Sequence, residues 1–223
     1  MSKIAFSMRD QMDSMSEDKF EGEMGLSKAD FLDYLDKAAA VEERCRANVG
    51  DPAPDFSAHV LKDDGKVSSD LFTLSGHRGS PVSLIFGSYT CPIFRRQSER
   101  MKQLIGDFEN SVQFVFVYTL EAHPTDGWNT NSNRADEIMY AQPTDMNERA
   151  KVAHDWRNAY SFHSQVVLDW PDNRINDDYA GAPERLYVLD AKGVVTFKSE
   201  QGPYHDSHLE DWAAALRSAT TGA

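Results

Sequence analysis

Short apolar runs alternate with amphipathic segments along the middle of the chain. Residues 81–87 (PVSLIFG) and 112–118 (VQFVFVY) are almost continuously apolar, which is typical of strands covered on both faces of a sheet. Between them, residues 92–108 repeat apolar side chains at helical spacing. The order strand, helix, strand therefore predicts a parallel βαβ unit with a right-handed connection.

The flanking segments complete an α/β pattern. An alternating stretch at 56–60 precedes the turn signal Asp64-Gly65. Downstream the pattern predicts a helix at 145–160, a strand at 165–169, a short helix at 175–179, a hairpin of 184–190 and 194–198, and a last helix in LEDWAAALRS. This order is that of a thioredoxin-like fold, a mixed sheet of βαβ and ββα units with helices on both faces.

A helical extension precedes this fold. Residues 27–47 place apolar side chains on one helical stripe, with Ser27 as the N-cap. A Gly- and Pro-containing stretch at 48–54 ends the segment. We therefore predict an N-terminal acidic arm and helix at 1–48 and a thioredoxin-like domain at 49–223.

Charge and composition narrow the classes of partner. The 223 residues include 23 Lys and Arg against 36 Asp and Glu, a formal net charge of −13. This balance argues against a surface that follows nucleic-acid phosphates and against anionic membrane surfaces. No apolar run is long enough to span a bilayer, and the N-terminus lacks the apolar core of a secretory signal. We expect a cytoplasmic protein with no nucleic-acid or membrane partner.

The chain contains two cysteines, Cys45 and Cys91, too few for a disulfide framework. No Cys or His group has the spacing of a metal site, so no metal is expected. Cys45 lies on the apolar stripe of the N-terminal helix, which favours core packing. Its functional alternative is a resolving thiol that attacks an oxidised Cys91.

Cys91 is the candidate nucleophile. It follows the first strand of the βαβ unit and opens the next helix, so free backbone N–H groups and the positive end of the helix dipole face its sulfur. Both favour the thiolate, and we expect its pKa to fall below that of a free cysteine. The hydroxyls of Ser88 and Thr90 can donate hydrogen bonds to the thiolate. The alternative is a buried structural cysteine.

Further candidates follow the second parallel strand, at the same edge of the sheet. Glu121 and His123, two residues apart, could shuttle protons, or they could belong to a solvated loop. Trp128 could stack on an aromatic substrate or anchor the loop at 119–144. Tyr118 ends its strand and could place its hydroxyl in the same pocket.

A third group precedes the hairpin strand at 184–190. In thioredoxin-like folds a proline at the position of Pro183 faces the reactive cysteine. Arg185 could then stabilise the thiolate, and Glu184 could relay a proton. The alternative is a structural ion pair between Glu184 and Arg185, or with Asp169.

Four motifs together resemble the iodothyronine deiodinase family in a cysteine-containing, bacterial form. They are FGSYTCPIF at 86–94, EAHPTDGW at 121–128, APERLYVLD at 182–190 and GP at 202–203. EAHPTDGW is the most discriminating, because generic thioredoxins and peroxiredoxins lack this insertion. The segment VGDPAPDF, which opens the second predicted domain, resembles peroxiredoxins and redoxins.

The resemblance implies an oxidoreductase that removes iodide reductively from a small iodinated aromatic substrate such as an iodothyronine. Cys91 occupies the position of the family's selenocysteine, and Glu121, His123 and Glu184 match positions of the proton relay. Thr90 and Tyr118 also match site positions. The resemblance further implies no bound cofactor, an external thiol reductant (dithiothreitol, glutathione or a thioredoxin-like protein) and a homodimer.

Two other functions stay open at this stage. A peroxiredoxin-like thiol peroxidase would use the same Cys91, with Ser88 supplying the hydroxyl that this chemistry needs. Its usual proline is replaced by Leu84. A redoxin-fold module that binds an aromatic ligand, with Cys91 unreactive, is the third alternative.

Overall fold

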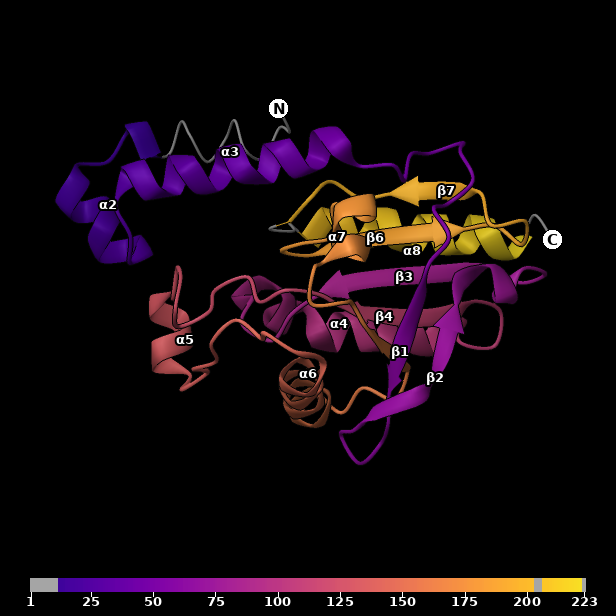
Figure 1. The fold of residues 1–223 in the computed structure, drawn as a ribbon. Coiled ribbons are helices and arrows are strands. Elements are labelled where there is room, and N and C mark those ends of the chain that lie inside the picture. Colours follow the sequence, from indigo (N-terminus) through magenta and orange to yellow (C-terminus); the bar gives the residue numbers. More distant parts are fainter. Residues whose placement is uncertain (1–11, 203–205, 222–223) are drawn as a thin grey trace.

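The structure is a computed structural model that describes residues 12–202 and 206–221. Within these ranges, a seven-stranded mixed sheet forms the centre of the fold, in the order β2-β1-β5-β4-β3-β6-β7 (Figure 1). The strands are β1 Ser57–Leu61, β2 Val67–Thr73, β3 Val82–Gly87, β4 Gln113–Tyr118, β5 Gln165–Leu168, β6 Arg185–Leu189 and β7 Val195–Lys198. The helices are α2 Glu17–Met24, α3 Lys28–Arg44, α4 Pro92–Phe108, α5 Asn131–Ala135, α6 Met146–Tyr160, α7 Arg174–Tyr179 and α8 Asp206–Thr221, with a 3₁₀ turn at Leu74–His77.

The predicted βαβ unit is confirmed. Strand β3 pairs in parallel with β4 from Val82 opposite Gln113 to Gly87 opposite Tyr118, and α4 connects them. Strand β5 extends the parallel part on the other side of β4. Pro92 occupies the first turn of α4, where its missing N–H has no intrahelical partner to lose.

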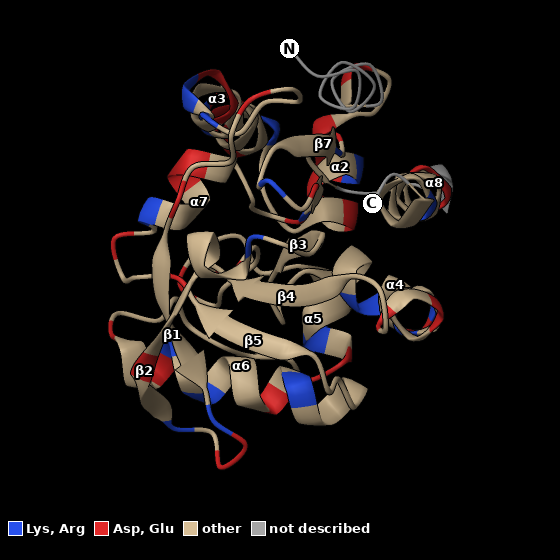
Figure 2. Cartoon of the chain, turned by 90° about the vertical axis from the view of Figure 1, so that its right-hand side faces the viewer, with Lys and Arg blue, Asp and Glu red and all other residues tan. Residues whose placement is uncertain are grey.

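Helices cover both faces of the sheet, as the thioredoxin-like prediction requires (Figure 2). Helices α4, α6 and α8 pack on one face over alternate side chains of the central strands. On the other face, α7 and the segment leading into β1 bury the intervening side chains. Most charged side chains lie on helices, connections and the outer strands, whereas the central strands β3, β4 and β5 carry none, because both of their faces are buried.

The N-terminal extension consists of α2 and α3, which lie beyond the edge of the sheet where β3 ends (Figure 1). Ser27 caps α3 as predicted, accepting a hydrogen bond from the amide of Asp30 (3.1 Å). The sequence of helix α2 has no clean apolar periodicity. The helix forms because Ser16 caps it and because Phe20 packs edge-on against Phe31, with 5.3 Å between the ring centroids. The predicted domain boundary at 48/49 stays a prediction, and residues 1–11 of the arm lie outside the described residues.

Among the described helices, none has the length and apolar character needed to cross a bilayer.

Candidate active site

Cys91 is the N-cap residue of α4 and lines an apolar cavity at this edge of the sheet. The cavity has a volume of about 390 Å³. Its wall combines α3, the start of α4, the loop that follows β4 and the turn before β6. The lining side chains include Tyr34, Leu35, Ala38, Cys91, Ile93, His123, Trp128, Pro183 and Gln201. Cavities of this size and lining are typical of small-molecule sites.

The state of the Cys91 thiol differs from the prediction. The residue is only 2% exposed, and this burial raises the pKa of the thiol far above its ordinary value. The charge of Glu184 raises the pKa further. The amides of Ile93 and Phe94 do act in the predicted direction and lower the pKa. Burial outweighs them, so the expectation of a depressed pKa was wrong, because the sequence does not show what covers the sulfur.

Glu121 holds the loop that leads into Cys91. Its carboxylate accepts hydrogen bonds from the Thr90 amide (3.0 Å), the Thr90 hydroxyl (2.7 Å) and the Tyr118 hydroxyl (2.7 Å). The Tyr118 oxygen in turn accepts from the Tyr89 amide (2.9 Å). Glu121 is 2% exposed, and burial raises its pKa against these hydrogen bonds. The side chains predicted to meet at the two strand ends therefore do meet, but Glu121 does not line the cavity.

His123 and Trp128 form one wall of the cavity. The His123 amide donates to the Thr90 hydroxyl (3.0 Å), so Thr90 links His123 to Glu121. The His123 ring contacts Trp128 edge-on, with 4.3 Å between the ring centroids. Burial lowers the pKa of His123 to about 4. The Trp128 indole donates to the carbonyl of Met24 (2.8 Å). Trp128 therefore both anchors its loop to the N-terminal helices and faces the cavity.

The other predicted hydroxyl has a local partner. Ser88 is fully buried, and its oxygen accepts from the amide of Ala122 (3.0 Å). This bond ties the two loops of the site together. The structure gives Ser88 no hydrogen bond to the Cys91 sulfur.

Glu184 and Arg185 are adjacent in sequence, but their side chains interact with different parts of the protein. Glu184 is fully buried, and its charge acts on Cys91. The chain packs so closely here that a Cβ on Gly202 would lie 2.2 Å from the Glu184 Cγ. Arg185 instead forms an ion pair with Glu42 of α3 and donates to the carbonyl of Ser199 (3.0 Å). Arg185 therefore does form a structural ion pair, but with Glu42 and not with Glu184 or Asp169, the partners that the sequence suggested.

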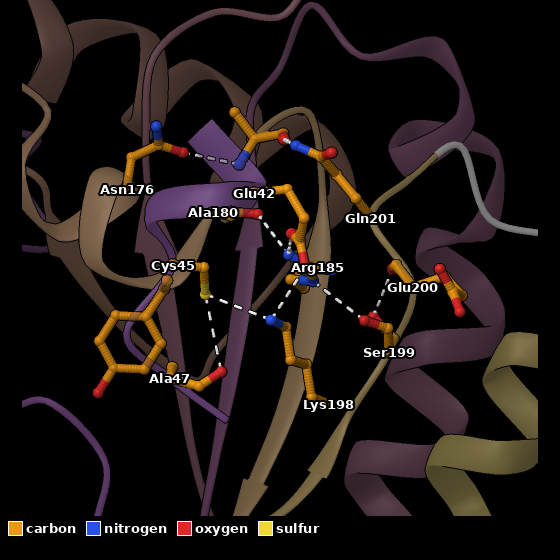
Figure 3. Close-up of polar contacts among 12 residues, drawn as sticks. Glu42, Cys45, Ala47, Asn176, Ala180, Arg185, Lys198, Ser199, Glu200 and Gln201 are labelled. Atoms are coloured by element: carbon orange, nitrogen blue, oxygen red, sulfur yellow. Dashed lines mark hydrogen bonds and ion pairs between the residues drawn. The ribbon is translucent and has the colours of Figure 1, made fainter. Parts of the chain in front are cut away.

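Cys45 is the C-cap residue of α3, where its sulfur contacts Lys198 (Figure 3). It is not among the residues that line the cavity. It is half-buried against the core on one face of the sheet, whereas Cys91 belongs to the core on the other face. The Lys198 ammonium donates to its sulfur (3.3 Å). The core-packing interpretation fits this environment better than a resolving thiol.

Three residues near the site were not predicted from the sequence. Arg95, one turn into α4, is buried and its charge lowers the Cys91 pKa. Asn133 of α5 accepts from Arg95 (2.8 Å) and donates to the carbonyl of Thr90 (2.8 Å). Tyr34 of α3 faces the cavity. Only Arg95 has a sequence signal, a charged residue on the inward face of an amphipathic helix.

Within the ranges that the structure describes, no group of three or more His, Cys, Asp or Glu side chains could hold a metal ion. Pro203 of the GP motif lies outside these ranges, while Gly202 lines the cavity.

The fold and the position of the cysteine define a thioredoxin-like protein. A thiol:disulfide interchange protein of the DsbE type from Chlorobium tepidum superposes with a TM-score of 0.54 at 19% identity, covering 78% of this chain and 99% of that one. The thioredoxin domain of a thiol-disulfide oxidoreductase from Bacteroides vulgatus gives a TM-score of 0.51 at 14% identity, covering 75% and 96%. At these identities the likeness concerns the fold.

Sequence comparison gives the family. The family model described as iodothyronine deiodinase matches residues 3–217, and the chain belongs to this family of oxidoreductases. Thyroxine 5-deiodinase of Homo sapiens is 31% identical over 170 residues, which cover 75% of this chain and 53% of that protein. The Gallus gallus protein of the same name is 34% identical, covering 74% and 62%. The chain thus spans little more than half the length of these curated relatives. The predicted family is confirmed.

Proposed function

We propose that this chain removes iodide reductively from iodinated phenols, with the Cys91 sulfur as nucleophile and an external thiol as reductant. The observation that carries the proposal is the position of Cys91 at the N-terminus of α4, facing an apolar cavity of about 390 Å³. Trp128 and His123 give this cavity an aromatic wall that suits an aromatic ring. The relatives named thyroxine 5-deiodinase supply the class of reaction.

The sulfur attacks iodine along the carbon–iodine axis. A sulfur–iodine bond forms while the carbon–iodine bond breaks, and its electron pair stays on the ring carbon, which takes up a proton. One reductant thiol then displaces iodide from the sulfenyl iodide and leaves a mixed disulfide. A second thiol restores Cys91, and the reductant leaves as a disulfide. The ring gains two electrons and the two reductant thiols lose them.

The raised pKa of Cys91 agrees with the need for a proton in this reaction. Burial and the Glu184 charge keep the thiol protonated at rest, so the site already holds the proton that the ring carbon takes up. His123, whose pKa is lowered to about 4, is a neutral imidazole at pH 7 and passes the thiol proton on to the ring carbon while the sulfur–iodine bond forms, without holding it as a stable imidazolium. We assign the relay to His123 and Glu184.

Glu121 takes a different part in this proposal. Its carboxylate oxygens already accept three hydrogen bonds from Thr90 and Tyr118. It acts as a positioning residue that fixes the loop before Cys91 and, through Thr90, the backbone of His123.

The thiol peroxidase alternative has less support. That chemistry needs a readily formed thiolate, whereas burial raises the pKa of the Cys91 thiol despite the nearby charge of Arg95. Arg185, the guanidinium that the sequence offered for this role, pairs with Glu42.

Iodide release from an iodothyronine or an iodotyrosine, with excess dithiothreitol, tests the proposal. We expect Cys91→Ser to abolish release. Cys45→Ser is the matched control and should keep it, because Cys45 lies outside the cavity. Full release by Cys91→Ser, or no release by the wild-type protein from either substrate class, would overturn the proposal.

A further inference from the structure

A tyrosine of the N-terminal extension faces the candidate nucleophile. Tyr34 of α3 lines the same cavity as Cys91 and His123. Burial raises the pKa of its hydroxyl, and the charges of Cys91 and Glu184 raise it further. These charges act on Tyr34 because the groups lie close together in surroundings from which water is largely excluded. Helix α3 is therefore part of the wall of the site.

The Tyr34 ring is held in place from two sides. It stacks on Phe31 of its own helix, with 6.4 Å between the ring centroids, and contacts Trp128 edge-on, with 5.1 Å between the centroids. Helix α3 is fixed in turn by Glu42, which pairs with Arg185 and with Lys198 (3.0 Å). The hydroxyl thus has a defined position in the cavity wall.

The hydroxyl of Tyr34 is available for a ligand, whereas three polar neighbours in the wall are occupied by protein partners. Asn131 donates to the carbonyls of Gly22 and Glu23, Ser132 to the carboxylate of Asp136, and Gln201 to the carbonyl of Ala182. Within the described part of the chain, no protein group forms a hydrogen bond with the Tyr34 hydroxyl. A donor that none of the described residues uses, inside an apolar cavity, points to an acceptor on the ligand.

We propose that Tyr34 is a substrate-binding residue that donates a hydrogen bond to the phenolic oxygen of the iodinated ring, so that the neighbouring carbon–iodine bond points at Cys91. This inference rests on the proposed function. In an ortho-iodophenol the oxygen and the iodine sit on adjacent ring carbons, so a donor near the sulfur can hold one while the sulfur meets the other. Ortho iodine also makes the phenol more acidic, and a phenolate beside Glu184 needs a donor that offsets the repulsion between the two charges.

Binding of 2,6-diiodophenol and of its methyl ether, 2,6-diiodoanisole, separates this role from simple packing. Both ligands are titrated by calorimetry into Cys91→Ser protein, in which no turnover occurs. We expect Tyr34→Phe to weaken phenol binding by about 10-fold or more, because a hydrogen bond to a charged acceptor is lost. Binding of the ether should change by less than about 2-fold, because its oxygen carries no charge. Asp33→Asn, a neighbour on the exposed side of α3, is the matched control and should change neither.

The phenylalanine variant keeps the ring that packs on Phe31 and Trp128, so its fold is expected to persist, and thermal unfolding checks this. Equal loss of phenol and ether binding, unchanged phenol binding, or no binding of the phenol by the starting protein would each overturn the inference. In the Cys91-containing protein, Tyr34→Phe should raise KM for 2,6-diiodophenol more than it lowers kcat. If the wild-type protein releases no iodide while phenol binding still depends on Tyr34, the proposed function fails and the phenol site stands.

Discussion

Glu42 ties α3 to β6 and β7 beside the site, and its removal tests that attachment (Figure 3). Its carboxylate pairs with Arg185 through one oxygen and with Lys198 through the other (3.0 Å). The Arg185 side chain is 3% exposed and that of Glu42 is 34% exposed. Glu42→Ala therefore leaves a buried guanidinium without its carboxylate.

The expected loss of stability follows from this geometry. Breaking a fully buried ion pair costs about 3 to 5 kcal/mol. Here water can enter from the side of Glu42, and Arg185 keeps its bonds to the carbonyls of Ser199 and Ala180 (3.0 and 3.1 Å). We therefore expect the free energy of unfolding to fall by about 2 to 3 kcal/mol.

Urea denaturation of wild type, Glu42→Ala and Glu43→Ala measures this loss. Glu43 is the next residue on α3, and it is exposed. Its replacement should change stability by no more than about 0.5 kcal/mol, and it controls for the change in helix propensity. If Glu42→Ala loses no more than Glu43→Ala, Glu42 does not hold the helix, and the reasoning about Arg185 is refuted.

Three further outcomes are expected. Thr90→Val removes the hydroxyl that links Glu121 to the His123 amide. It should lower the free energy of unfolding, measured in urea, by about 1 to 3 kcal/mol and slow iodide release. Thr90→Ser keeps a hydroxyl and should keep the wild-type stability and rate of release. In Cys45→Ser protein, alkylation of Cys91 by iodoacetamide should quicken steadily as pH rises above neutrality, because burial raises the thiol pKa; a plateau reached near neutral pH would contradict this assignment. The pKa of His123 is lowered to about 4 from 6.5 by burial, so its contribution to stability is present above pH 6.5 and is lost as pH falls toward 4. The wild-type protein should therefore lose more stability on acidification than His123→Gln, which has no imidazole. Between pH 7 and about pH 4, the difference in unfolding free energy between the two proteins should fall by about 2 to 3 kcal/mol. A difference that stays constant over this range would argue for an accessible imidazole.

The local elements were largely predictable. The helix predicted at 92–108 has those bounds in the structure, and the strand predicted at 81–87 begins one residue later. Both succeed because an amphipathic period and a proline in the first turn report directly on local geometry. The same local signals place Cys91 at a helix N-terminus and Glu121 at a strand end, which is why the sequence brings the two loops of the site together.

The chemistry of the site was less predictable. Arg185 finds its carboxylate on Glu42, 143 positions away, and Tyr34 reaches the site from a helix that the sequence assigns to a separate extension. The pattern of apolar residues within one segment does not show which distant segment will pack against it. Family motifs identify the neighbours of Cys91 but are silent on α3.

By itself, the sequence determined the order of strands and helices apart from α2 and α5, the edge of the sheet where polar groups gather, and Cys91 as the candidate nucleophile. Tertiary structure alone decided that burial raises the pKa of the Cys91 thiol, that the Glu121 carboxylate bonds to the loop before Cys91 and that Tyr34 faces the cavity. The physical reason is that helix and strand formation depend on neighbours along the chain, whereas desolvation and ion pairing depend on everything that packs around a group in space.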